Sequence, residues 1–203
     1  MDWCCTIRME LSMGTQSLTA DESLPRVRPD EFPAAKSRLL RYQLNVIATD
    51  VADVVQSVGG WLFDRSMAGW DVNVLLANHD DTRPLRILGA RTFELHPTLL
   101  SIGSGAERAV GIAIAADLLG TDECIDAAIR DALQSGEVEV TLWGESRFAE
   151  RATAVQYRLS AAARIFKDCA LAAAMLTDVS VAPVETLFCS GYRPVDSHLI
   201  PVS

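Results

Sequence analysis

Several common sequence features are missing from this chain of 203 residues. No apolar run reaches the length of about 18 residues that spans a membrane. No C-x-x-C pair supports a zinc ribbon or a redox motif, and the patterns G-x-S-x-G, H-E-x-x-H and Walker A are absent. No basic region followed by an apolar stretch marks a signal peptide. We therefore expect a cytoplasmic protein with no membrane segment, no cofactor and no metal site.

Lysine is also scarce, since only Lys36 and Lys167 accompany 16 arginines among the 18 basic residues. The net charge is −9, which is the wrong sign for a protein that binds nucleic acid over its whole surface. Hydrophobic residues make up 49 % and charged residues 22 % of the chain. This composition is typical of one globular domain with its own core.

The domain organisation follows from the placement of proline and of hydrophobic periodicity. Residues 1–33 contain Pro25, Pro29 and Pro33 and show no sustained period. We interpret 1–33 as a flexible tail, 34–190 as a single domain and 191–203 as a second tail.

Periodicity within the domain predicts a mixed order of helices and strands. The expected helices run from Ala34 to about residue 62, from Ser104 to Gly120, from Thr121 to Ser135, and from Arg147 to Leu176. The expected strands are 70–77, 85–89 (antiparallel to the first), 99–102, 137–142 with one solvent-exposed face, and 184–189. This order predicts a layered α/β or α+β domain with a central mixed sheet of about four to five strands and two long amphipathic helices.

The first candidate site is a glycine turn before a predicted helix, formed by Gly103, Ser104 and Gly105 with Arg108 nearby. Free backbone N–H groups at a helix N-terminus suit a phosphate or a carboxylate. The alternative is a purely structural turn, because Ser104 and Glu107 form a capping box.

A second candidate is the polar loop Asn78-His79-Asp80-Asp81. Histidine beside carboxylates can bind a metal or transfer protons. Adjacent loop residues do not converge easily on one ion, so we expect a solvated turn here.

A third feature is a stripe of arginines, Arg147, Arg151 and Arg158, on the last predicted helix. The stripe could meet a protein partner, a nucleic acid or the protein's own acidic helix, or could be a solvated face. Nucleic acid is the least favoured of these, because the rest of the chain is acidic.

With no catalytic signature, the leading hypothesis is an interaction or regulatory protein rather than an enzyme. It would act as a homo-oligomer or with a protein partner, through its apolar helical stripes. The alternative is an enzyme or ligand-binding domain that holds a small anionic molecule at Gly103–Arg108. A nucleic-acid regulator using the arginine stripe is a further alternative.

Overall fold

The computed structural model describes residues 42–78, 81–96, 111–144, 152–191 and 200–201, all within one unit, Leu40–Ser203. The strands are β1 (Gln43–Ala48), β2 (Asp71–Leu76), β3 (Arg91–Glu94), β4 (Gly111–Ala115), β5 (Glu139–Trp143), β6 (Thr153–Arg158), β7 (Val184–Gly191) and β8 (Ile200–Pro201). The helices are α1 (Val51–Met67), α2 (Arg83–Ile87), the 3-10 turn η3 (Ala116–Leu118), α4 (Glu123–Ser135) and α5 (Ala161–Ala173).

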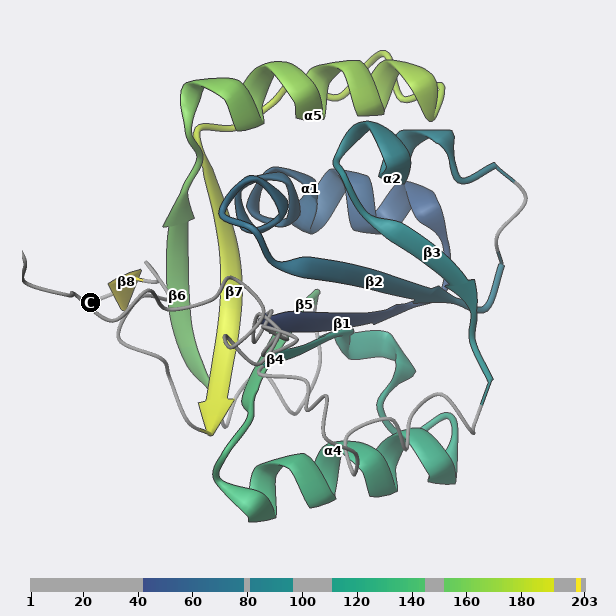
Figure 1. The fold of residues 1–203 in the computed structure, drawn as a ribbon, viewed down its shortest axis with the longest axis vertical. Coiled ribbons are helices and arrows are strands. Elements are labelled where there is room, and N and C mark those ends of the chain that lie inside the picture. The colour runs from purple at the N-terminus through teal and green to yellow at the C-terminus, as the bar shows by residue number, and fades with distance from the viewer. Residues whose placement is uncertain (1–41, 79–80, 97–110, 145–151, 192–199, 202–203) are drawn as a thin grey trace, which may run out of the picture. The chain divides into compact units, whose positions relative to one another are not determined.

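The described strands form one eight-stranded sheet with the order β3-β2-β1-β4-β5-β7-β6-β8. The first five strands in this order are parallel, and β7, β6 and β8 continue the sheet in antiparallel pairs. Figure 1 shows the strong twist between the two parts, with β7 crossing the direction of β1 and β2. The predicted α/β class with a central mixed sheet is confirmed, with more strands than the four to five expected.

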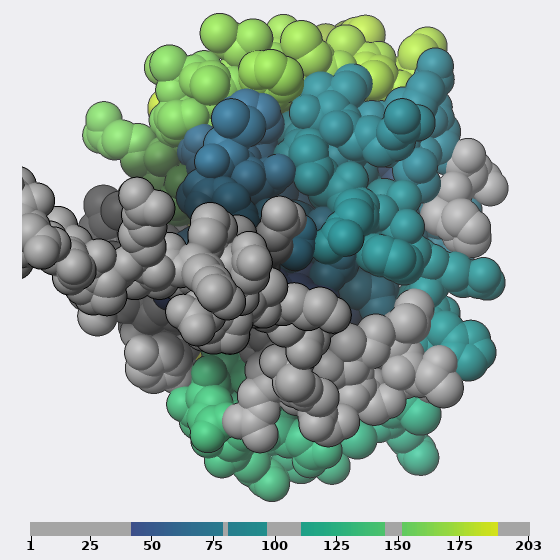
Figure 2. Space-filling view, viewed as in Figure 1, coloured from purple at the N-terminus to yellow at the C-terminus, as the bar shows by residue number. Residues whose placement is uncertain are grey.

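Helices cover both faces of the sheet. In Figure 1, α1 and α2 lie on one face and α4 on the other, while α5 packs on α1 and α2 on the side away from the sheet. The same contact is visible in Figure 2, where α5 in yellow-green meets α2 in teal and α1 in blue. Each face has its own hydrophobic cluster. No helix in the described ranges is long and apolar enough to cross a membrane.

The first long predicted helix is wrong in its amino-terminal half. Residues Gln43–Ala48 form β1, and α1 begins only at Val51, after Asp50 caps it. The strand lies between β2 and β4 and is buried over most of its length. A strand covered on both faces carries apolar residues at consecutive positions, and these also matched a helical spacing.

The glycine pair in α1, Gly59 and Gly60, is a close packing contact. A Cβ atom on Gly60 would lie 2.5 Å from Leu159 Cδ2, and one on Gly59 would lie 3.1 Å from Leu88 Cδ1. Gly69 follows the helix with φ of +90°, a left-handed conformation in which the helix ends.

A buried ion pair meets α1 at the same point. Lys167 Nζ donates to Glu185 Oε1 (2.6 Å) and to the carbonyl oxygen of Gln56 (2.7 Å). Glu185 accepts from the backbone N–H groups of Gly60 (2.9 Å) and Trp61 (2.8 Å). The Gly60 N–H and the Gln56 carbonyl are the two groups that an uninterrupted helix would pair with each other. The side chains of Lys167 and Glu185, only 4 % and 3 % exposed, therefore hold α1 to α5 and β7.

Two further predictions in the first half of the domain are wrong. Residues 85–89 do not form a strand antiparallel to β2, because Arg83–Ile87 is the short helix α2 and the next strand, β3, runs parallel to β2. The predicted helix 104–120 is wrong in its described part, since Gly111–Ala115 forms β4 between β1 and β5 and only the short 3-10 turn η3 follows it.

The last predicted helix, 147–176, is also wrong in its first part. Thr153–Arg158 forms β6, in which Val155 and Tyr157 are buried and their neighbours are not, and α5 begins at Ala161 after the cap Ser160. Strand β5 was expected to have one solvent-exposed face. All its residues are buried, because it lies between β4 and β7 inside the sheet. The predictions for β2, α4 and β7 are confirmed.

Candidate functional site

The site begins where β1 ends. Ala48 closes the strand, and Asp50 caps α1 by accepting a hydrogen bond from the Asp53 N–H at 2.9 Å. The Asp50 backbone is extended (φ −144°, ψ 167°), which is the usual conformation of an N-cap residue. The chain therefore turns from strand to helix within two residues and leaves the Asp50 carboxylate at the edge of the sheet.

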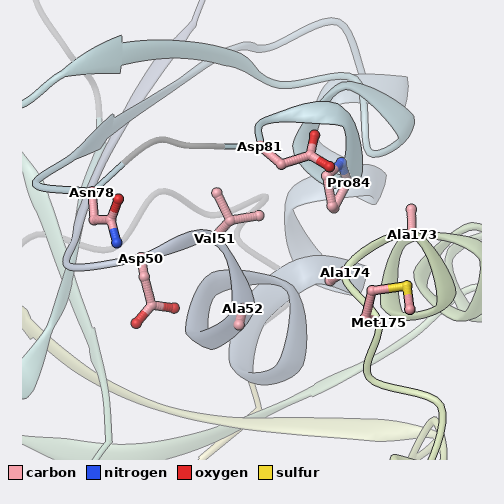
Figure 3. A pocket seen from close by; sticks show the side chains of 9 residues that line it. All are labelled: Asp50, Val51, Ala52, Asn78, Asp81, Pro84, Ala173, Ala174 and Met175. Carbon is pink, nitrogen blue, oxygen red and sulfur yellow. The ribbon is translucent and has the colours of Figure 1, made fainter.

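The end of β2 lies directly beside this turn. The Ala77 N–H donates to the Ala48 carbonyl (3.1 Å), and the Asn78 N–H donates to the Thr49 carbonyl (2.8 Å). These bonds extend the β1–β2 pairing past the strands and place Asn78 next to Asp50, as Figure 3 shows. In parallel α/β sheets this carboxyl edge is where ligands bind.

A cavity of about 390 Å³ opens at this edge, and we call it the carboxyl-edge cavity. Its volume falls in the usual range of small-molecule sites. Its polar wall consists of Asp50, Asn78 and Asp81. Its apolar wall consists of Val51, Ala52, Pro84, Ala173, Ala174 and Met175. Figure 3 shows that these apolar side chains come from the start of α1, from Pro84 in α2 and from the end of α5.

Asp81 carries a negative charge into the cavity wall. Arg83 binds it with Nη2 at 2.6 Å from Oδ2 and Nε at 3.0 Å from each carboxylate oxygen. These side-chain hydrogen bonds, with a further one from the Arg83 N–H, lower the pKa of Asp81 below its ordinary value. The charge of Asp81 is thus paired with that of Arg83, and both side chains are exposed.

Asp53, one turn into α1, has a structural task. Its Oδ1 accepts from Ser57 Oγ at 2.9 Å, and its Oδ2 accepts from the indole N–H of Trp143 at 2.8 Å. Trp143 is the last residue of β5 and is 1 % exposed. The bond fixes the start of α1 to the end of β5.

The described residues contain no group of three or more histidine, cysteine, aspartate or glutamate side chains placed to hold a metal ion. At the carboxyl edge, Asp50 caps α1 and Asp53 uses both carboxylate oxygens in hydrogen bonds. We therefore assign none of these carboxylates to a metal.

Most of the site residues proposed from sequence lie outside the described ranges: Gly103, Ser104, Gly105, Arg108, Arg147 and Arg151. Arg158 is described and ends strand β6, so the three arginines do not share one helix. Of the polar loop, Asn78 and Asp81 both line the cavity, whereas His79 and Asp80 are outside the described ranges.

Sequence reasoning missed Asp50 and Met175. A signal for Asp50 was present, because an aspartate directly after a short apolar run and three residues before another acid is typical of an N-cap. The prediction of one helix over residues 34–62 concealed this N-cap signal. Met175 carries no local signal, since its role depends on what α5 packs against.

Neither a known protein family nor a characterised protein matches this sequence. Solved structures do match the fold. A deacetylase–teicoplanin complex from the teicoplanin biosynthesis pathway has 14 % identity and a TM-score of 0.51, covering 79 % of this chain and 99 % of that one. A triple mutant of a deacetylase involved in the same pathway has 15 % identity and a TM-score of 0.50, covering 76 % and 99 %. The 4-carboxy-2-hydroxymuconate hydratase of Pseudomonas putida has 11 % identity and a TM-score of 0.48, covering 75 % and 97 %.

These neighbours correct the functional prediction. The first two are deacetylases, so the fold is one that enzymes use. The prediction of an interaction or regulatory protein without catalytic character is wrong on this comparison. The alternative prediction, an enzyme or ligand-binding domain, is the better supported one.

Proposed function

We propose that this domain is an enzyme or ligand-binding domain that holds a small polar molecule in the carboxyl-edge cavity. The observation that carries the proposal is the position of Asp50 and Asn78. Each lies two residues after the end of one of two adjacent parallel strands, and both line one cavity. Side chains at this edge belong to neighbouring strands of a rigid sheet, which is the arrangement that positions ligands in α/β enzymes.

The polar wall favours ligands that donate hydrogen bonds. Asp50 and Asp81 contribute carboxylate oxygens, which accept only, and Asn78 contributes an amide that both donates and accepts. Hydroxyl groups match all three side chains. Because the Asp81 charge is paired with Arg83, it is the Asp50 carboxylate that favours an ammonium group over a phosphate or a carboxylate. An amino sugar such as glucosamine combines the two favoured groups and serves as the first probe.

The test is a binding titration of the full chain with glucosamine, followed by two-dimensional NMR. Asn78→Ala removes an exposed side chain from the polar wall, and Gln134→Ala on α4 removes an exposed amide elsewhere. We expect Asn78→Ala to weaken glucosamine binding about 3- to 10-fold, as for the loss of one hydrogen bond. Equal affinities in the two variants would refute the proposal.

Turnover separates an enzyme from a binding domain. Because the structural neighbours are deacetylases, the first reaction to assay is the release of acetate from N-acetylglucosamine. Loss of that release in Asn78→Ala, with Gln134→Ala unchanged, assigns the activity to this cavity.

Three sequence predictions stay untested beside this proposal. The glycine turn at Gly103–Arg108 as an anion site lies outside the described residues. Self-association has no observation for or against it. The cytoplasmic location is a proposal that agrees with the free thiols of Cys124, Cys169 and Cys189.

A further inference from the structure

We infer that the ligand of the carboxyl-edge cavity is amphipathic, with an ammonium or hydroxylated head and an apolar chain that lies against Met175. The inference rests on the proposed function and adds the class of ligand and the residue that selects it. It follows from the backbone conformation of Met175, its exposure and its place opposite the polar wall.

Met175 has an unusual backbone conformation. Its φ is +60°, and it is the one non-glycine residue of the described chain with a positive φ. It follows the C-cap Ala174 of α5, where the Met175 N–H donates to the Ala172 carbonyl (3.1 Å) and the Leu176 N–H to the Leu171 carbonyl (2.9 Å). This is the hydrogen-bond pattern in which glycine normally occupies the left-handed position. α1 and α4 do end on glycines at such a position, Gly69 and Gly136.

The side chain of Met175 is exposed to solvent. Met175 is 83 % exposed, the highest value among the large hydrophobic residues that the structure describes. It lines the carboxyl-edge cavity together with Pro84 and Val51, as Figure 3 shows. Strain kept in a non-glycine residue at the rim of a cavity points to a functional demand on that side chain.

The two walls together define the ligand. The carboxylate of Asp50 attracts a cationic head, and the carboxylate of Asp81, whose charge is paired with Arg83, accepts hydrogen bonds from hydroxyl groups. The flexible thioether of Met175 adapts to an apolar chain. A purely polar ligand would leave the apolar wall unused. A purely apolar ligand would desolvate the Asp50 carboxylate without giving it a further hydrogen bond.

The probes are methylammonium, butylammonium and hexylammonium, with hexanoate as the matched anion of equal chain length. Binding to the full chain is measured by NMR titration. We expect affinity to increase about two- to fourfold for each methylene that the apolar wall covers, and hexylammonium to bind several-fold more tightly than hexanoate. The preference for the cation falls as salt is added, because the attracting carboxylate of Asp50 is partly exposed.

The decisive variant is Met175→Gly, which removes the side chain and relieves the left-handed backbone. We expect the melting temperature to rise while hexylammonium binding weakens several-fold and methylammonium binding stays the same. Met67→Ala is the control, because Met67 is also exposed (71 %) but lies at the opposite end of α1. It should leave every affinity unchanged.

Each outcome decides a separate claim. Hexylammonium affinity that does not depend on chain length, or that is the same in Met175→Gly, overturns the inference. A melting temperature that does not rise overturns the argument from strain. If neither glucosamine nor any alkylammonium binds in a way that depends on Asn78, the proposed function itself fails.

Discussion

Replacing Lys167 by methionine tests how the interior of α1 is held. The substitution keeps an apolar stem of similar length and removes the ammonium. Glu185 is then a carboxylate buried at 4 % exposure, with only the N–H groups of Gly60 and Trp61 as partners. Breaking a buried ion pair in this way costs about 3–5 kcal/mol of stability. For a domain of this size, about 2–4 °C is lost per kcal/mol, so the melting temperature should fall by about 10 °C.

The loss should depend on pH in a defined direction. Burial raises the pKa of Glu185 above its ordinary value of 4.5, and Lys167 opposes that rise. In Lys167→Met the ammonium group no longer lowers the pKa of Glu185, so the folded-state pKa of Glu185 rises further. A carboxyl group with a raised folded-state pKa contributes stability that is fully present below pH 4.5 and lost as the pH rises through the folded-state pKa. The variant should therefore be less impaired at pH 5 than at pH 8.

The assay is urea unfolding followed by circular dichroism at both pH values. Arg164→Met, an exposed residue on the same helix, is the matched control and should change stability little. The double variant Lys167→Met/Glu185→Gln removes both charges and should recover much of the loss. A loss below about 1 kcal/mol at pH 8, or an equal loss at pH 5, would refute the reasoning, since such a value is typical of a surface pair.

Three further outcomes follow from individual contacts. Gly60→Ala should destabilise by about 1–3 kcal/mol in urea unfolding, because its Cβ would lie 2.5 Å from Leu159 Cδ2; a stabilised variant would contradict the packing. Burial and Asp64, which accepts the Tyr157 hydroxyl at 3.1 Å, raise the Tyr157 pKa above its ordinary value of 10.0. Stability from this group is present below pH 10 and lost above it, so Tyr157→Phe should shift alkaline unfolding to higher pH, and an unchanged midpoint would count against the contact. Asp122→Ala should cost about 1 kcal/mol and speed amide exchange in α4, since Asp122 caps Cys124 and Ile125.

The class of fold and several elements were determined by local sequence. In α4, Ile125 and Ile129 repeat at helical spacing between the cap Asp122 and the left-handed Gly136, and the structure has the helix there. The strand β2 holds two valines and two leucines in six residues, and β7 begins with Val-Glu-Thr-Leu, in which two of the four residues are β-branched; both features are typical of strands. In each case the deciding interactions lie within about ten residues, so local pattern was sufficient.

The tertiary structure decided where strand gives way to helix in 43–67 and in 153–173. Both segments pass from strand to helix in two residues, without a glycine or proline between them. Their apolar residues also fit one continuous helical period, so the sequence alone favoured a single long helix. Only pairing within the sheet distinguishes the two structures, because β1 gains hydrogen bonds from β2 and β4, and β6 gains them from β7.

The candidate site was beyond local pattern for the same reason. Asp50, Asn78 and Met175 come from three segments far apart in the chain. Asp50 carries an N-cap signal and Asn78 lies in a polar loop, but no local pattern brings the three residues together. They meet because β1 and β2 are parallel, which brings their ends to one edge, and because α5 packs over α1 with its end at that edge. A cavity is a property of the space between elements, and that space exists only after the elements have packed.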